Sequence, residues 1–289
     1  MTHYRKETIR RMTASTQRWR EDMALPRRPL DAAMKEYLKD WKSDLPLAWK
    51  SILSRVELNF GAASYLQLKS NETVFPLRKG HRSAVAPAGS HLLKALDAVD
   101  PEKVRAVLLG QDPYPDLAKA TGRSFEQGNL TDWSKPGEVA PSLKNICQAL
   151  VCHRAGSASA SIEAPQALFD RWGREGVLCL NAGLSFSRKE AMTQQAHIHL
   201  WKPLVREIFI HLVRRPACPL LVLLWGNEAR VAFRDMGIEV EASGEGNAGR
   251  LIVVKRAHPA TSLFLKNQPD AFTDANLALE QAGWPTIAW

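Results

Sequence analysis

The residues most able to do chemistry in this chain come directly after short apolar runs. Gln111 and Asp112 follow the first run, Asn181 the second and Asn227 the third, while His258 comes shortly after the fourth. In an open parallel sheet the carboxyl ends of the strands lie on one edge, where the loops diverge and leave a crevice. We therefore expect a carboxylate, amides and an imidazole to face one cavity, with Asp112 as the candidate general base.

Each of these residues also has a simpler interpretation when it is taken alone. Asp and Pro are common turn formers, so Asp112 followed by Pro113 is equally typical of an ordinary turn. Asn181 alone is compatible with a turn cap, and His258 alone with a hydrogen-bonded loop histidine. Their convergence on one predicted sheet edge is what favours a functional site.

Alternating strand and helix patterns predict the elements that would position these residues. Four apolar runs are typical of buried strands: Val104–Leu109, Val177–Leu180, Leu220–Trp225 and Leu251–Val254. Helical patterns separate or follow them at about residues 142–153, 165–174, 199–214, 227–236 and 270–282. We expect a single-domain α/β fold with a central, mostly parallel four-stranded sheet flanked by helices on both faces.

The first 44 residues differ from the rest of the chain in composition. Residues 1–29 are rich in arginine and poor in apolar periodicity, which is typical of a tail of uncertain order. Apolar residues then recur at helical spacing and predict a short amphipathic helix: Leu30, Met34, Tyr37, Leu38 and Trp41. We therefore divide the chain into a basic, partly helical N-terminal extension, residues 1–44, and a catalytic domain, residues 45–289.

The overall charge favours a polyanionic partner. The 39 Lys and Arg residues against 30 Asp and Glu give a formal net charge of +9, the sign expected for binding nucleic acid. The cysteines lack C-x-x-C spacing and are typical of reduced intracellular thiols: Cys147, Cys152, Cys179 and Cys218. Because no apolar run reaches the ~18 residues of a membrane span and no secretory signal opens the sequence, we expect a cytoplasmic protein without membrane contact.

Several common enzyme signatures are missing where they would be needed. No G-x-G-x-x-G fingerprint of a dinucleotide-binding enzyme follows the first predicted strand, and the G-x-x-x-x-G-K-[ST] loop of nucleotide triphosphatases is absent. The H-x-E and P-C-x-x-C pair of zinc base deaminases and the H-E-x-x-H motif of zinc proteases are absent too. We therefore expect chemistry that uses no cofactor and no metal.

At these residues the chain resembles uracil-DNA glycosylase of family 1, over about Leu45 to Trp289. Separate motifs carry the resemblance in the right order: GQDPY at 110–114, Gly122–Phe125, PSLKNI at 141–146, GVLCLNAGLS at 176–185, LLWG at 223–226, AHP at 257–259 and the ending AFTDANLALEQAGWPTIAW. The resemblance implies a metal-independent hydrolase of base-excision repair. Such an enzyme flips uracil out of DNA and hydrolyses its N-glycosidic bond, releasing free uracil and leaving an abasic site.

The resemblance implies catalytic roles for Asp112 and His258. Asp112 would orient the attacking water and stabilise the positively charged sugar, and His258 would donate a hydrogen bond to the departing uracil O2. These roles are physically coherent, because breaking the glycosidic bond builds positive charge on the sugar and negative charge on the base. A carboxylate and a donor are then needed on opposite sides of the bond.

By the same resemblance, four further residues would form the uracil pocket. Gln111 would offer its backbone to a uracil carbonyl, and Phe125 would stack on the flipped base. Asn181 would read the Watson–Crick edge of the base with its side-chain amide. Tyr114 would crowd the C5 position, so that the methyl group of thymine cannot enter.

The DNA-binding residues that the resemblance implies include Pro113 and Ser142, the latter holding a phosphate at a helix start. Family members also have a loop, His-Pro-Ser-Pro-Leu-Ser, that pinches the backbone and inserts a leucine into the vacated stack. Here the positions after Pro259 are Ala260, Thr261, Ser262 and Leu263. We call the residue that enters the vacated stack the wedge. In this chain either Leu263 or Phe264 could take that role.

Two alternatives to plain uracil excision stay open. One is a shifted base specificity, and the other is a DNA- or partner-binding protein of the same fold with weak activity, which the altered loop favours. The expected partner is uracil-containing DNA, single- or double-stranded, and the expected state is a monomer. A small acidic protein that mimics DNA inhibits the family. We expect it to bind this chain poorly, because Ala260, Thr261 and Ser262 replace the Ser, Pro and Leu of the family loop that it clasps, and because Asp116 adds like charge.

Overall fold

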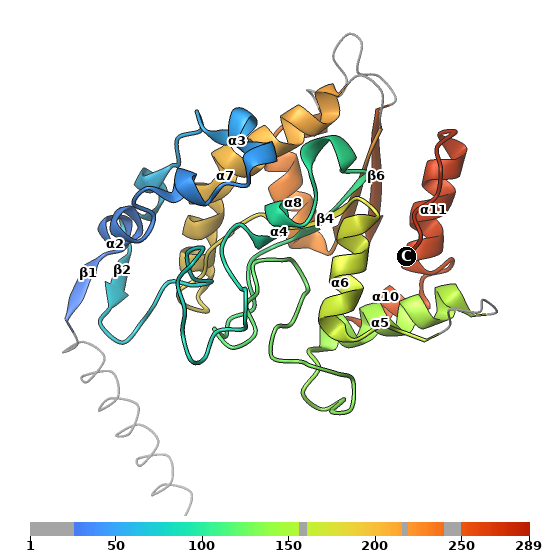
Figure 1. The fold of residues 1–289 in the computed structure, drawn as a ribbon, viewed down its shortest axis with the longest axis horizontal. Helices are drawn as coiled ribbons and strands as arrows, with labels where there is room; N and C mark the ends of the chain where they lie inside the picture. Colours follow the sequence, from blue (N-terminus) through green and yellow to red (C-terminus); the bar gives the residue numbers. More distant parts are fainter. Residues whose placement is uncertain (1–25, 156–160, 216–218, 240–249) are drawn as a thin grey trace, which may run out of the picture.

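Four parallel strands form the centre of the molecule (Figure 1). The computed structural model describes residues 26–155, 161–215, 219–239 and 250–289. The sheet has the order β4-β3-β5-β6, with these bounds: β3 Ala106–Gly110, β4 Val177–Asn181, β5 Leu220–Trp225 and β6 Leu251–Arg256. Each neighbouring pair is parallel, and Ala106 of β3 lies opposite both Val177 and Leu221. The predicted α/β fold with a four-stranded sheet is confirmed.

Side chains alternate between the two faces of the sheet, and each face is covered by helices. Val107 and Leu109 of β3 belong to a buried cluster that also includes residues of α3 (Leu47–Leu53), α4 (Lys94–Asp97), α7 (Ala191–Arg214) and α8 (Asn227–Asp235). Ala106 and Leu108 belong to a second cluster with residues of α5 (Pro141–Arg154), α6 (Pro165–Arg174), α10 (Ser262–Lys266) and α11 (Ala271–Gln281). β3 is therefore buried on both faces, as its apolar sequence predicts.

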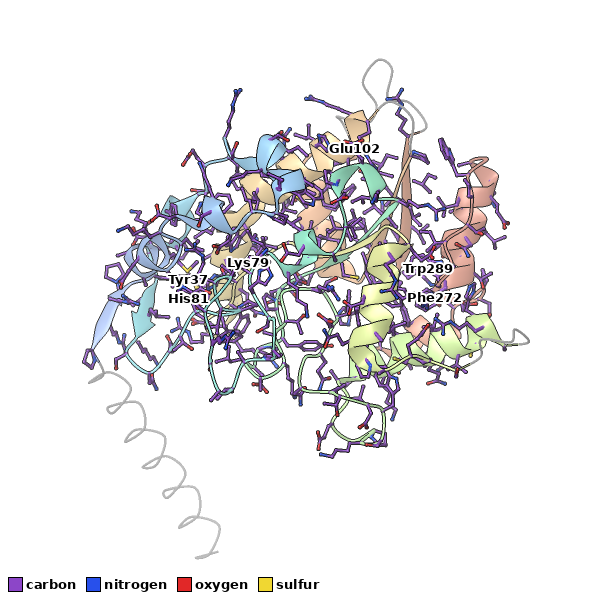
Figure 2. The ribbon with its side chains drawn as sticks, in the orientation of Figure 1. Tyr37, Lys79, His81, Glu102, Phe272 and Trp289 are labelled. Carbon is purple, nitrogen blue, oxygen red and sulfur yellow. The ribbon has the colours of Figure 1, made fainter. Side chains whose placement is uncertain are left out.

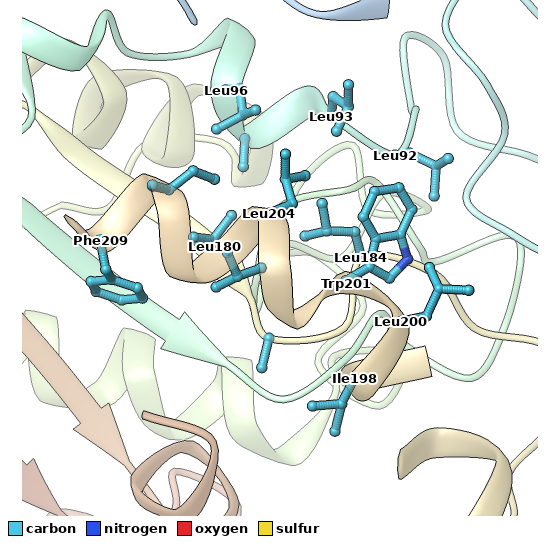
Figure 3. Close-up of a cluster of buried hydrophobic side chains, with 14 of the residues drawn as sticks. Leu92, Leu93, Leu96, Leu180, Leu184, Ile198, Leu200, Trp201, Leu204 and Phe209 are labelled. Atoms are coloured by element: carbon cyan, nitrogen blue, oxygen red, sulfur yellow. The ribbon is translucent and has the colours of Figure 1, made fainter. Parts of the chain in front are cut away.

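Helix α7 contributes a large part of one helical layer, and Figure 3 shows its apolar side chains beside those of β4. Trp201, Leu204 and Phe209 of α7 are fully buried together with Leu180 of β4. The sequence pattern predicts a helix from about residue 199, whereas α7 begins at Ala191. The earlier turns escape prediction because their sequence, AMTQQAHI, lacks a continuous apolar stripe.

A small antiparallel ribbon and a short helix precede the main sheet. β1 (Arg27–Pro29) pairs with β2 (Gln67–Lys69), and the predicted amphipathic helix is α2 (Leu30–Tyr37). Short 3-10 helices follow at η1 (Trp41–Asp44), η2 (Phe60–Ala63) and η3 (Pro101–Lys103). The Trp41 ring packs edge-on against Trp201 of α7, with ring centroids 6.0 Å apart. Most of the predicted arginine-rich tail lies outside the described residues, and a domain boundary at residue 44 stays a prediction.

Specific contacts attach both ends of the described chain to the rest of the molecule (Figure 2). Near the first end, the Tyr37 hydroxyl donates to the Pro76 carbonyl. At the other end, the Trp289 indole donates to the side-chain oxygen of Asn276 in α11 at 3.0 Å. The Trp289 ring lies 5.2 Å from that of Phe272, so the last residues of the chain pack on α11.

Membrane and metal features can be assessed for the described residues only. None of the helices there is long and apolar enough to cross a membrane. The same residues contain no group of three or more His, Cys, Asp and Glu side chains that could hold a metal ion. Cys147, Cys152 and Cys179 are free thiols, whereas Cys218 lies outside the described residues. Cytoplasmic localisation stays a prediction.

Candidate active site

A cavity of about 160 Å³ lies at the carboxyl edge of the sheet. The residues that the sequence nominates for catalysis and uracil binding all line it: Asp112, His258, Gln111, Tyr114, Phe125 and Asn181. Pro113 and Ser142, nominated for DNA contact, line it as well. The structure therefore brings together residues from β3, β4, the start of α5 and the loop after β6, as expected for the edge of a parallel sheet.

Close backbone contacts join the ends of β3 and β4. Ala182 donates its N–H to the Gly110 carbonyl at 2.9 Å, and Gly183 donates to the Gln111 carbonyl at 2.9 Å. A Cβ atom on Gly110 would collide with the side-chain oxygen of Asn181 and lie 2.7 Å from Cβ of Ser124. Glycine at position 110 is thus what lets the buried Asn181 amide reach the cavity beside Gln111.

Asp112 is a largely buried carboxylate with one strong hydrogen bond. The amide nitrogen of Gln194, in the first turn of α7, donates to its Oδ2 at 2.6 Å. Burial raises the pKa of Asp112 to about 6, the Gln194 hydrogen bond lowers it, and the negative charge of Glu228 raises it. Lys189 opposes that rise in the Asp112 pKa. The group is consequently ionised at neutral pH while facing a poorly solvated cavity.

Phe125 stands on a strained stretch of backbone at the cavity wall. Its φ of 62° lies in the left-handed region, which is uncommon for a bulky residue. The preceding Ser124 holds this turn, because its N–H donates to the Cys179 carbonyl at 3.1 Å and its hydroxyl donates to the Leu108 carbonyl at 2.9 Å. The Phe125 ring lies 5.9 Å from the Trp225 ring, so a fixed aromatic wall faces the cavity.

Tyr114 lies in the segment that follows β3, and its hydroxyl makes two contacts. Its hydroxyl donates to the Phe125 carbonyl at 3.3 Å and lies 3.3 Å from the Ser142 hydroxyl at the start of α5. Burial raises the pKa of Tyr114 to about 12, so the phenol is neutral at physiological pH. These contacts fix the ring as a rigid steric wall.

His258 lies at the mouth of the cavity with its protonation pattern defined by the backbone. The N–H of Ala260 donates to its Nδ1 at 3.1 Å, so in the neutral ring the proton is on Nε2. Partial burial lowers the pKa of His258, which favours this neutral form. Gly226 lies beneath the ring with φ of 104°, and a Cβ there would approach the His258 Cδ2 to 2.8 Å.

The segment after His258 leads from the cavity into α10. Asn145 of α5 donates to the Pro259 carbonyl at 2.6 Å, and Thr261 donates both its N–H and its hydroxyl to the His258 carbonyl. Ala260, Thr261, Ser262 and Leu263 are exposed and do not line the cavity. Their predicted contact with DNA stays a prediction.

The two candidates for the wedge occupy opposite environments. Leu263 is 58% exposed, whereas Phe264 is 1% exposed and packs edge-on against Trp225 with ring centroids 5.1 Å apart. A buried core side chain is not available to enter DNA. Of the two, Leu263 is the side chain at the surface.

Other residues at the site escape prediction from the sequence. Arg123 and Glu228 line the cavity, and Gln194 contacts Asp112 from α7. Glu228 follows a predicted strand by three residues, so the strand-end argument extended by that much would have found it. Arg123 lies within the motif at 122–125 but its guanidinium is engaged by Asp170 at 2.7 Å. Gln194 carries no local signal, because its contact depends on where α7 begins.

Comparison with known proteins identifies relatives over most of the chain. No family model matches the sequence. The chain is 30% identical over 238 residues to the uracil-DNA glycosylase of Limosilactobacillus fermentum, covering 80% of this chain and 89% of that protein. It is 31% identical over 222 residues to a uracil-DNA glycosylase of a Sinorhizobium species, covering 73% of this chain and 88% of that protein.

Solved structures agree in fold. The wild-type UNG crystal structure from Nitratifractor salsuginis matches with a TM-score of 0.56 at 24% identity, covering 90% of this chain and 99% of that one. A mimivirus UNG variant in complex with UGI matches with a TM-score of 0.58 at 18% identity, covering 86% of this chain and 90% of that one. The structural likeness supports the shared fold, and the identity to curated relatives extends over nearly their whole length. This chain belongs to the uracil-DNA glycosylase family.

Proposed function

We propose that the cavity at the carboxyl edge of the sheet excises uracil from DNA, with Asp112 and His258 as its catalytic residues. As a uracil-DNA glycosylase, the chain is a hydrolase of base-excision repair. The observation that carries the assignment of roles is the convergence of the partly buried Asp112 carboxylate, the Asn181 amide and a neutral imidazole on one small cavity. The products are free uracil and an abasic site.

Asp112 acts on the sugar side of the glycosidic bond. As the bond to N1 of uracil breaks, positive charge develops on the deoxyribose, and an ionised carboxylate in a poorly solvated cavity stabilises that charge strongly. Asp112 also accepts a hydrogen bond from the attacking water and orients it toward the anomeric carbon. Its raised pKa of about 6 means that the charge is present at neutral pH but is lost in mild acid.

His258 acts on the base side of the bond. Because the Ala260 N–H occupies Nδ1, the neutral ring presents Nε2–H as a donor. Negative charge develops on uracil O2 as the base departs, and this donor stabilises it without a proton having to be transferred. The low pKa of His258 keeps the ring neutral, which avoids placing a full positive charge next to the developing sugar cation.

Four residues recognise the base. Asn181 offers one donor and one acceptor to the Watson–Crick edge of uracil, and Phe125 supplies a face for stacking. The Gln111 backbone meets a uracil carbonyl. The partly buried ring of Tyr114 occupies the space next to C5 and excludes thymine by steric conflict.

The rim of the cavity binds the DNA from which the base is flipped. Ser142 and the start of α5 hold a phosphate, and Pro113 contacts the backbone. The segment from Ala260 to Leu263, which includes the start of α10, approaches the same strand, and Leu263 fills the space that the flipped nucleotide leaves. Burying this leucine offsets part of the unstacking cost of a few kcal/mol.

Measuring free uracil tests the proposal directly. The purified chain is incubated with single-stranded and duplex oligonucleotides that contain one uracil, in the presence of EDTA, and the released base is quantified. We expect release from both substrates and none from thymine-containing controls. Tight binding to these oligonucleotides without release would instead support the alternative of a DNA-binding protein with an inactive site.

A further inference from the structure

We propose that Gln194 is a positioning residue that holds the Asp112 carboxylate in its reactive orientation, an inference that rests on the proposed excision of uracil. Gln194 lies in the first turn of α7, far from Asp112 in sequence. Its side-chain amide donates to Oδ2 of Asp112 at 2.6 Å. Among the described residues, Gln194 is the one whose side chain donates a hydrogen bond to Asp112.

Because of this hydrogen bond, the two carboxylate oxygens of Asp112 have different roles. Oδ2 is held by Gln194, so rotation about the last bond of the Asp112 side chain is restricted. Oδ1 is left to face the attacking water and the developing charge on the sugar. Fixing a reacting group in this way removes an orientational entropy cost that would otherwise be met in the transition state.

A neutral amide is well suited to this task. A lysine or arginine in contact with Asp112 would cancel much of the negative charge that stabilises the sugar cation, whereas Gln194 orients the carboxylate and leaves its charge intact. The charged groups that act on Asp112 are Lys189, just before α7, and Glu228, in the first turn of α8, and they shift its pKa in opposite directions. His258 and the Asp170-bound Arg123 line other parts of the cavity.

The start of α7 is anchored firmly enough to act as a support. One turn after Gln194, the buried His197 bridges two hydroxyls, with Nδ1 at 2.8 Å from Ser185 and Nε2 at 2.9 Å from Ser187. Trp201 donates to the Ser185 hydroxyl at 2.7 Å. Burial lowers the pKa of His197 to about 4, so the ring stays neutral and this network does not change near neutral pH.

Gln194→Leu removes the donor and tests the proposal. We expect kcat to fall about ten- to a hundredfold, the scale of a lost hydrogen bond to a charged group, with KM for DNA little changed. The acidic limb of the pH profile should move to higher pH, because the hydrogen bond lowers the pKa of Asp112. The matched control is Gln195→Leu, since Gln195 contacts His199 and not Asp112, and we expect wild-type kinetics from it.

Gln194→Glu tests whether the side chain at position 194 contacts the Asp112 carboxylate. This change keeps the shape of the side chain but places a second carboxylate against Asp112, so the acidic limb should move further toward neutral pH than in Gln194→Leu. An unmoved pH profile in this variant would mean that the side chain at position 194 does not contact the Asp112 carboxylate. Circular dichroism confirms that each variant is folded before its kinetics are interpreted.

A double-mutant cycle completes the test. In the background of Asp112→Asn, Gln194→Leu should cause little further loss, because its effect acts through the Asp112 carboxylate. Full additivity of the two changes, or an unmoved pH profile in both Gln194 variants, would overturn the inference. Failure of the proposed function looks different, because the wild-type chain itself would then release no uracil.

Discussion

Asp112 is subject to two opposing demands. Burial and Glu228 make the charged form costly, which is why its pKa lies at about 6 and not near 3.8, yet the proposed reaction needs that charge. The folded state therefore binds the Asp112 proton more tightly than the unfolded chain. Its contribution to stability is full below about pH 3.8 and is lost as pH rises through about 6.

Replacing Asp112 by Asn should separate activity from stability. We expect uracil release to fall by about 10² to 10³ in kcat, because the charge that stabilises the sugar cation is gone. At pH 7 the free energy of unfolding should rise by about 1 to 3 kcal/mol, because no carboxylate has to be kept charged in the cavity. Base-release kinetics and urea titration measure the two effects, and undiminished activity would remove Asp112 from the mechanism.

The pH dependence of the wild-type enzyme follows from the same group. We expect kcat/KM to fall tenfold per pH unit below an apparent pKa of about 6, as Asp112 becomes protonated. His258 does not oppose this trend, because its lowered pKa keeps the ring neutral down to lower pH than usual. A profile that stays flat to pH 4.5 would contradict the assignment of the limb to Asp112.

Tyr114 should determine the rejection of thymine. Tyr114→Ala removes the ring that we propose to lie against C5, and we expect thymine release to become detectable while uracil release is reduced. A single methyl in a pocket of adaptable shape is discriminated by about 1 to 3 kcal/mol, so strict rejection requires a rigid wall. Tyr114→Phe is the matched control, since it keeps the ring and loses only the hydroxyl contacts, and it should still reject thymine.

At the scale of the elements, the strands were predictable and the start of α7 was not. Strands such as Leu220–Trp225 are buried on both faces and therefore consist of consecutive apolar residues, a pattern that can be recognised in the sequence. The first turns of α7 are mostly polar, with Gln194 bound to Asp112, so they give no continuous apolar stripe from which a helix could be predicted. The contact between Gln194 and Asp112 joins residues 82 positions apart and emerges only from the packing of α7 on the sheet.

The loop after β6 shows the same limit. The sequence pattern left Leu263 and Phe264 equally eligible as the wedge, because both are large and apolar. Their environments differ through contacts with distant elements: Phe264 packs on Trp225 of β5, and Leu263 remains in solvent. Tertiary packing therefore decides a question that residue type leaves open.

Leu263→Ala tests the wedge assignment. We expect uracil release from duplex DNA to fall about tenfold or more, because the side chain no longer fills the vacated stack, a loss of about 1.5 to 3 kcal/mol if the leucine is fully buried. Release from single-stranded DNA should change much less, since no duplex stack has to be broken. Leu277→Ala on α11 is the matched control, because that leucine is also partly exposed, at 41%, but lies outside the cavity rim. Equal losses on both substrates would count against a wedge.

For the whole molecule, the net charge of +9 favours DNA and acidic proteins alike. Specific contacts at the rim, and not the total charge, should then distinguish these partners. Phosphate contacts release counterions, so DNA binding should weaken steeply as salt is raised. The exposed Asp116 directly follows Pro115, which lines the cavity, and its carboxylate lies 3.9 Å from the Lys119 ammonium.

Inhibition by the small acidic protein that mimics DNA should therefore be weak. In this chain the inhibitor would meet Ala260, Thr261 and Ser262 where the resembling family motif has Ser, Pro and Leu, and it would approach Asp116 against like charge. We expect little loss of uracil release at inhibitor concentrations that silence ordinary family members. Stoichiometric inhibition would mean that Leu263 serves as the apolar anchor despite its shifted position.

Leu263 and Phe264 are adjacent at the start of α10, so the exposed leucine is directly supported by a buried residue. Phe264 is clamped in the core against Trp225, and Trp225 in turn touches the Phe125 ring of the cavity wall. In its proposed role as the wedge, Leu263 would press against Phe264, one residue away, and two ring contacts connect Phe264 to the cavity wall. The proposed wedge and the proposed stacking face for the base, Phe125, are thus connected by packed aromatic rings, so a displacement of one would be resisted by the other.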